Sequence, residues 1–128
     1  MSYYFSKMLE TDMDDAIART IKALSNEGFG VLTEIDIQAT LKKKLGADFK
    51  PYRILGACNP GFAYKALTTE DKVGTMLPCN VILHEVAPGA VEVSAVNPIA
   101  SMSAIQNQDL EEIALQVRDK LRNVIEAL

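Results

Sequence analysis

The chain has 128 residues, a usual length for one domain and enough to bury a core without disulfides or bound metal. Hydrophobic residues make up 48% and charged residues 23%, and no apolar run approaches the length of a membrane-spanning helix. A net charge of −4 argues against binding to nucleic acid or to an anionic membrane. The first residues lack the pattern of a secretory signal, so we expect a cytoplasmic protein.

The N-terminal third predicts a strand and a helix. Residues 2–8 are expected to form the strand, and apolar residues recur at helical spacing over residues 12–27. Gly28 should end this helix in a left-handed conformation, which would bring Phe29 into contact with Leu24 as in a Schellman motif. This helix boundary is therefore well defined by the sequence.

Alternation over residues 31–37 predicts a second strand, and a short helix should follow and end at Gly46. That helix is expected to turn three apolar side chains inward: Ala39, Leu41 and Leu45. Residues 52–58 are almost wholly apolar, which predicts a central strand covered on both faces.

A helix should start at Asn59 and Pro60, since Asn is a good N-cap and Pro suits the first helical position. Residues 79–86 and 90–96 then predict a hairpin around Pro88 and Gly89. The second arm alternates, so it should have one solvated side and lie at an edge or toward a dimer partner.

A long amphipathic helix closes the chain, with a capping-box-like start at Asp109. Together these elements predict one domain over residues 1–128. The expected class is α+β: two layers, a mixed β-sheet with helices packed on one face, and a C-terminal β-hairpin followed by the long helix.

Cys58 and Cys79 are the only cysteines, and each is followed by Asn and has Pro nearby. Cys58 precedes a helix N-terminus, a position that stabilises a thiolate. The structural alternative is that both thiols are buried as small hydrophobic groups. They meet only if the third and fourth strands are antiparallel neighbours, which the sequence leaves open.

Other chemistry has less support. His84 should point away from Cys79 and lie far along the strand, so we predict no metal site and no Cys/His catalytic pair. No glycine-rich phosphate-binding motif is present, and we expect no cofactor. The lysines at 42–44, with Lys50 and Arg53, are better explained as a solvated surface than as an anion site.

Asn59, Asn80 and Asn97 lie beside Pro or Cys at element ends, where amides either cap and close turns or orient a ligand. The binding hypothesis gives a pocket lined by Cys58, Asn59, Cys79 and Asn80, with Asn97 as a further contact.

On these residues the chain resembles the domain of unknown function 302 family over essentially its whole length. The resemblance is carried by Gly28–Val31, Ile35–Asp36, Leu41–Lys42, Leu45–Gly46, Ile54–Pro60, Leu77–Pro78 and Asn97–Pro98. It implies a single α+β domain that tends to form homodimers, and it implies no settled activity, substrate or cofactor.

The leading functional hypothesis is a non-enzymatic, homodimeric module that binds a small ligand or a partner protein. The alternative is a thiol enzyme or redox sensor in which Cys58 is the reactive thiolate and Cys79 resolves it. A third reading is a purely structural interaction domain.

Overall fold

A computed structural model describes residues 2–128. The elements, in chain order, are β1 (Tyr4–Leu9), α1 (Met13–Asn26), β2 (Gly30–Asp36), α2 (Ile37–Leu45), β3 (Tyr52–Cys58), α3 (Pro60–Thr69), the 3-10 helix η1 (Asp71–Met76), β4 (Cys79–Ala87), β5 (Ala90–Val96), α4 (Pro98–Ser101) and α5 (Gln108–Glu126). No helix within residues 2–128 is long and apolar enough to cross a membrane.

The strands form one five-stranded sheet in the order β1-β5-β4-β3-β2. The α+β class is confirmed, but the expectation of a mixed sheet is wrong, because each of the four neighbouring pairs is antiparallel. The predicted hairpin joins β4 to β5, and Gly89 in its turn has a positive φ of 79°. β5 is an interior strand and not an edge, since β1 adds outside it.

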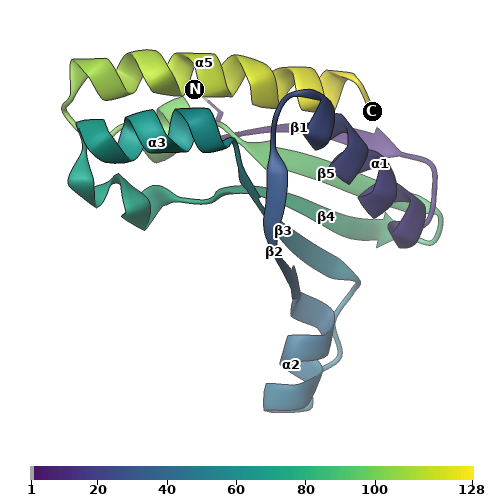
Figure 1. Ribbon diagram of the computed structural model, residues 1–128. Coiled ribbons are helices and arrows are strands. Elements are labelled where there is room, and N and C mark those ends of the chain that lie inside the picture. The colour runs from purple at the N-terminus through teal and green to yellow at the C-terminus, as the bar shows by residue number, and fades with distance from the viewer. Residues whose placement is uncertain (1) are drawn as a thin grey trace.

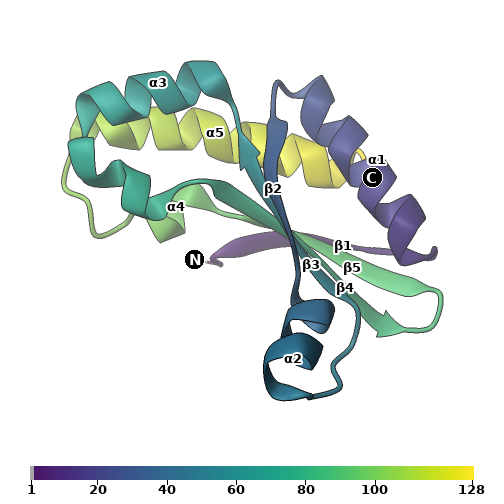
Figure 2. The ribbon, with the colours of Figure 1, turned by 60° about the horizontal axis from the view of Figure 1, so that its bottom comes forward.

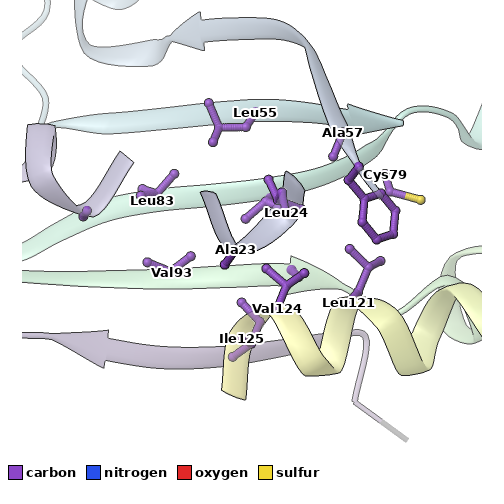
Figure 3. Packing of buried hydrophobic residues seen from close by; sticks show 14 of the residues in the cluster. Ala23, Leu24, Leu55, Ala57, Cys79, Leu83, Val93, Leu121, Val124 and Ile125 are labelled. Atoms are coloured by element: carbon purple, nitrogen blue, oxygen red, sulfur yellow. The ribbon is translucent and has the colours of Figure 1, made fainter. Parts of the chain in front are cut away.

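Helices α1, α3 and α5 lie together over one face of the sheet (Figures 1 and 2). The core lies between these two layers, and Figure 3 shows Leu121 and Val124 of α5 packed toward Leu24 of α1 and Val93 of β5. Helix α5 buries its apolar stripe as predicted, although it starts one residue after Asn107 and not at Asp109. The Asn107 side chain accepts hydrogen bonds from the backbone N–H groups of Asp109 and Leu110, so it is the N-cap.

The end of α1 confirms the predicted Schellman motif. The Phe29 N–H donates to the Leu24 carbonyl at 2.9 Å, and Gly28 takes a φ of +86°. Phe29 is buried in the core, so this turn directs the chain from α1 into β2.

The other face of the sheet carries no helix within residues 2–128 (Figure 1). Strand β3 is an interior strand, between β4 and the edge strand β2, but it is not covered on both faces: Leu55 is fully buried on the helix side, and Ile54 on the other side is only partly buried. The apolar sequence of β3 predicted burial that the described residues do not supply.

Helix α2 departs furthest from expectation. It extends away from the rest of the molecule on the side opposite to the other helices (Figures 1 and 2). Every residue of Ile37–Leu45 is exposed or partly exposed, and Leu45, expected to face inward, is 74% exposed. The boundaries follow the sequence more closely: Asp36 caps the helix by accepting from the Ala39 N–H, and Gly46 ends it at a φ of +65°.

Candidate functional site

A hydrophobic cavity of about 350 Å³ lies where α3, η1 and α5 meet the ends of β3 and β4. Seventeen residues line it, and none has a charged side chain: Phe29, Leu32, Ala57, Cys58, Asn59, Phe62, Ala63, Ala66, Leu67, Gly74, Leu77, Pro78, Cys79, Pro98, Met102, Ala114 and Val117. Leu32, Leu67 and Gly74 are exposed, so the cavity reaches solvent along these residues. Its volume is at the lower end of the range for small-molecule sites.

Antiparallel pairing of β3 with β4 brings the two cysteines to one end of the sheet. Ala57 pairs with Cys79, so Cys58 lies one residue along β3 from the partner of Cys79. Both thiols are free, and both residues line the cavity. Of the two arrangements that the sequence left open, the structure therefore has the one in which the two Cys-Asn steps lie close together.

Cys79 is a buried thiol at the outer end of the core cluster, where its sulfur is directed away from Leu83 (Figure 3). Burial, and to a lesser extent the neighbouring Cys58, raises the pKa of Cys79 from 9.0 to about 11. Cys79 is thus a neutral, weakly polar wall of the cavity near neutral pH, because only the thiolate is a strong nucleophile.

Asn59 links two parts of the cavity wall. It stands at the N-cap position of α3, but its side chain makes no capping hydrogen bond. Its Nδ2 instead donates to the Glu27 carbonyl at 3.2 Å, which ties the end of α1 to the start of α3. The amide oxygen, free of the capping role, is the strongest hydrogen-bond acceptor among the lining side chains.

The two remaining predicted residues lie outside this cavity. Asn80 is exposed in β4 and borders a hollow on the opposite face of the sheet. Asn97 caps α4 by accepting from the Ile99 N–H, and it donates to the Ser2 carbonyl. Capping accounts for Asn97, so the structure groups Cys58, Asn59 and Cys79 and leaves Asn80 and Asn97 apart.

Most residues of the cavity wall were not predicted from the sequence as site residues. Phe62, Ala63 and Ala66 come from α3, while Ala114 and Val117 come from α5. In the sequence Val117 and Ala114 belong to an apolar stripe that is equally well explained by core packing. The small size of the alanines is the one local signal, since small side chains on facing helices leave space between them.

Two other chemistries find no support in residues 2–128. No group of three or more His, Cys, Asp or Glu side chains is placed to hold a metal ion. Arg53, considered with the nearby lysines, forms ion pairs with Glu34 at 2.7 Å and Asp36 at 3.3 Å. Its charge is thereby neutralised between β2 and β3.

The raised pKa of Cys79 predicts a pH effect on stability. Between about pH 9 and pH 11 the folded protein keeps the Cys79 proton and the unfolded chain loses it. The contribution of the protonated Cys79 to the free energy of unfolding is complete below pH 9 and is lost as pH rises through 11. The loss amounts to up to about 3 kcal/mol. Denaturant unfolding under reducing conditions should show a steeper fall for the wild type than for Cys79→Ala. Parallel curves for the two proteins would show that Cys79 titrates normally.

Comparison with known proteins agrees with this architecture. The family model "Domain of unknown function DUF302" matches residues 5–128. A crystal structure of an uncharacterized conserved DUF302 protein from Bacillus stearothermophilus superposes with a TM-score of 0.91 at 28% sequence identity, covering 99% of this chain and 98% of that one. No curated protein matches the chain. A family model matched over nearly the whole length, together with this shared fold, makes the chain a member of the DUF302 family.

Proposed function

We propose that this protein is a binding module for a small, neutral, predominantly apolar molecule, which it takes into the cavity between α3, α5 and the ends of β3 and β4. The observation that carries the proposal is the cavity of about 350 Å³, whose wall is almost entirely carbon. Well-formed apolar pockets with a few polar groups are typical of ligand sites, and apolar cavities in proteins stay dry and take up apolar molecules.

The ligand should be uncharged because the wall offers no counter-charge. A buried carboxylate or ammonium without a partner is strongly disfavoured, and the polar side chains of the wall are two thiols and one amide, which supply no fixed counter-charge. The Asn59 side chain lines the cavity and does not cap α3, so its amide oxygen can accept one hydrogen bond from a ligand hydroxyl. An apolar body with one hydroxyl therefore fits the wall better than a fatty acid does.

A matched pair of probes tests this proposal. We expect 1-decanol to shift the NMR signals of cavity residues such as Phe62 and Val117, with saturable binding. Decanoate at pH 8 has the same chain but carries a charge, and it should bind at least tenfold more weakly, since its charge would lose hydration without a partner. Equal binding of both probes, or binding of neither, would contradict the proposal.

Narrowing the cavity should weaken binding of the ligand without unfolding the protein. Ala63 lines the cavity from α3 and is partly exposed, so Ala63→Phe adds a ring to the wall. We expect the dissociation constant for decanol to rise at least tenfold. The matched control is Ala18→Phe, at an exposed position of α1, which should leave binding unchanged. Titration of both variants by NMR gives the comparison, and similar affinities would place the ligand elsewhere.

A thiol enzyme or redox sensor is the second candidate, favoured by the juxtaposition of Cys58 and Cys79 across β3 and β4. The raised pKa of Cys79 opposes it, because this thiol stays protonated and nucleophilic attack requires a thiolate. Site-resolved labelling with iodoacetamide separates the two candidates. Rapid labelling of Cys58 near neutral pH would favour thiol chemistry, and two thiols inert until denaturation would favour the binding module.

We further propose that the module is a homodimer, as the resemblance to the family implied. The helix-free face of the sheet supports this assembly, because cores are normally covered by a second layer on each apolar face. Ligand binding and assembly involve opposite faces of the sheet, so each can be tested without the other.

A further inference from the structure

The helix-free face of the sheet, called the open face below, carries two groups of apolar side chains, which Glu92 and Ser94 of β5 separate. Ile35, Ile54 and Ile82 are direct cross-strand neighbours on β2, β3 and β4. Tyr4 and Met8 form the second group on β1, and both are exposed. Exposed apolar side chains gathered on one face and bordered by polar residues are typical of a protein–protein interface.

Two polar side chains within the open face are paired with each other. The His84 Nε2 lies 3.0 Å from the Glu92 Oε1 across β4 and β5. The His84 ring also stacks on Tyr52, with ring centroids 5.6 Å apart. The Nδ1 atom of His84 is buried and has no hydrogen-bond partner within residues 2–128, so covering this face leaves that nitrogen to be satisfied.

A hollow of about 350 Å³ lies within the open face. Its wall combines aromatic and aliphatic side chains with a few polar ones: Tyr3, Tyr4, Asn80, Ile82, His84, Glu92, Ser94, Ala95 and Val96. The exposed aromatic rings of Tyr3 and Tyr4 lie edge to face at 4.9 Å. Such a hollow suits an apolar side chain presented by a partner.

Helix α2 is the second unpartnered feature on the same side. It has nine residues, all at least partly exposed, and isolated helices of this length are marginal in water. Leu45 is 74% exposed, and Phe49, just beyond the helix, is 43% exposed. Figure 2 shows α2 standing below the sheet, clear of the helix layer. Leu45 of the helix is thus largely uncovered within residues 2–128, and Phe49 is covered only in part, by contacts that include the ring of Tyr52.

The charge distribution indicates which partner fits. Residues 37–50 contain four lysines and one aspartate, a formal charge of +3, within a chain whose total is −4. The remainder of the chain therefore carries −7. A basic arm on an acidic body attracts the acidic body of an identical molecule, and electrostatic complementarity of this kind favours association.

We propose that the interface lies on the open face: two copies of the chain pack their open faces together, and the α2 arm of each copy extends over the sheet of the other. Such an interface is isologous, because each copy supplies both an arm and a face. It covers Leu45 and Phe49 together with the three isoleucines of the open face. This inference rests on the homodimer proposed above and specifies its surface; it leaves the ligand cavity free.

Sedimentation equilibrium of three full-length proteins tests the interface. The wild type should have about twice the 14.0 kDa chain mass. Leu45→Lys leaves the core undisturbed but replaces an apolar contact of the arm by a charge that the interface would bury, a cost larger than the added attraction to the acidic body, so it should raise the dimer dissociation constant at least tenfold. Tyr64→Lys is the matched control, since Tyr64 is 73% exposed on α3 in the helix layer. This control should remain dimeric.

Each of the other outcomes would contradict a specific part of the proposal. A monomeric wild type at every concentration removes both the homodimer and the interface. A Leu45→Lys protein that stays as dimeric as the wild type removes the open-face interface and leaves the homodimer. Dissociation by Tyr64→Lys places the contact on the helix layer. Decanol titration of Leu45→Lys, expected to match the wild type, shows that the variant is folded and that the ligand proposal stands or falls separately.

Discussion

Leu121→Ala is expected to lower the free energy of unfolding by about 3 to 5 kcal/mol, a large part of the stability of a domain of this size. Leu121 is fully buried on α5 between the sheet and α1. Its neighbours come from several elements, so they cannot all move inward to fill the space that the missing atoms leave. The loss therefore includes a cavity term in addition to the lost burial of apolar surface.

Leu115 provides the control on the same helix. It is exposed, so Leu115→Ala should change the free energy of unfolding by less than about 1 kcal/mol while keeping the same helix propensity change. Chemical denaturation of both variants, followed by circular dichroism, gives the comparison. Equal losses would mean that α5 contributes through its helix propensity and not through packing on the sheet.

The sequence predicted the features of the fold that depend on neighbouring residues. Gly28 and Phe29 ended α1 as expected, because a left-handed glycine and a hydrophobic return contact are local requirements. Pro88 and Gly89 likewise defined the hairpin, and the apolar stripe of α5 is buried. In each case the atoms that decide the structure are close together in the chain.

Features that depend on distant parts of the chain were predicted less well. An apolar strand such as β3 signals burial, but it does not say whether the cover comes from the same molecule or from another. Leu45 was assigned to the interior for the same reason. β5 became an interior strand because β1, from the other end of the chain, pairs with it, and alternation within β5 carries no information about that partner.

The candidate site divides in the same way. The end of a strand followed by the start of a helix predicted the positions of Cys58 and Asn59. Cys79 lies near them because β3 and β4 are antiparallel, which the sequence did not decide. Asn80 follows Cys79 directly, yet successive residues of a strand point to opposite faces, so it borders the open face instead. The volume of the cavity depends on how α3 and α5 pack, which no local pattern states.

Gly56→Val should also lower stability, by about 3 kcal/mol, although valine is the better strand former. A Cβ at Gly56 would collide with the Thr33 hydroxyl and lie 2.8 Å from the Pro78 Cγ. The glycine thus permits the close approach of β2 and of the chain entering β4, two residues before Cys58. Distorting this point should also perturb the cavity, whose wall includes Pro78.

Gly30→Val is the matched control, because Gly30 also lies in a strand and a Cβ there meets nothing within 4 Å. We expect it to be neutral or to stabilise the protein by up to about 1 kcal/mol. Thr33→Ala combined with Gly56→Val should recover part of the loss, since it removes the hydroxyl and leaves only the contact with Pro78. Urea unfolding of the wild type, the two single glycine variants and the double variant tests this. If Gly56→Val lowers the free energy of unfolding no more than Gly30→Val does, or if the double variant recovers nothing, the prediction is wrong. Close packing at Gly56 would then not determine how β2, β3 and β4 converge on the cavity.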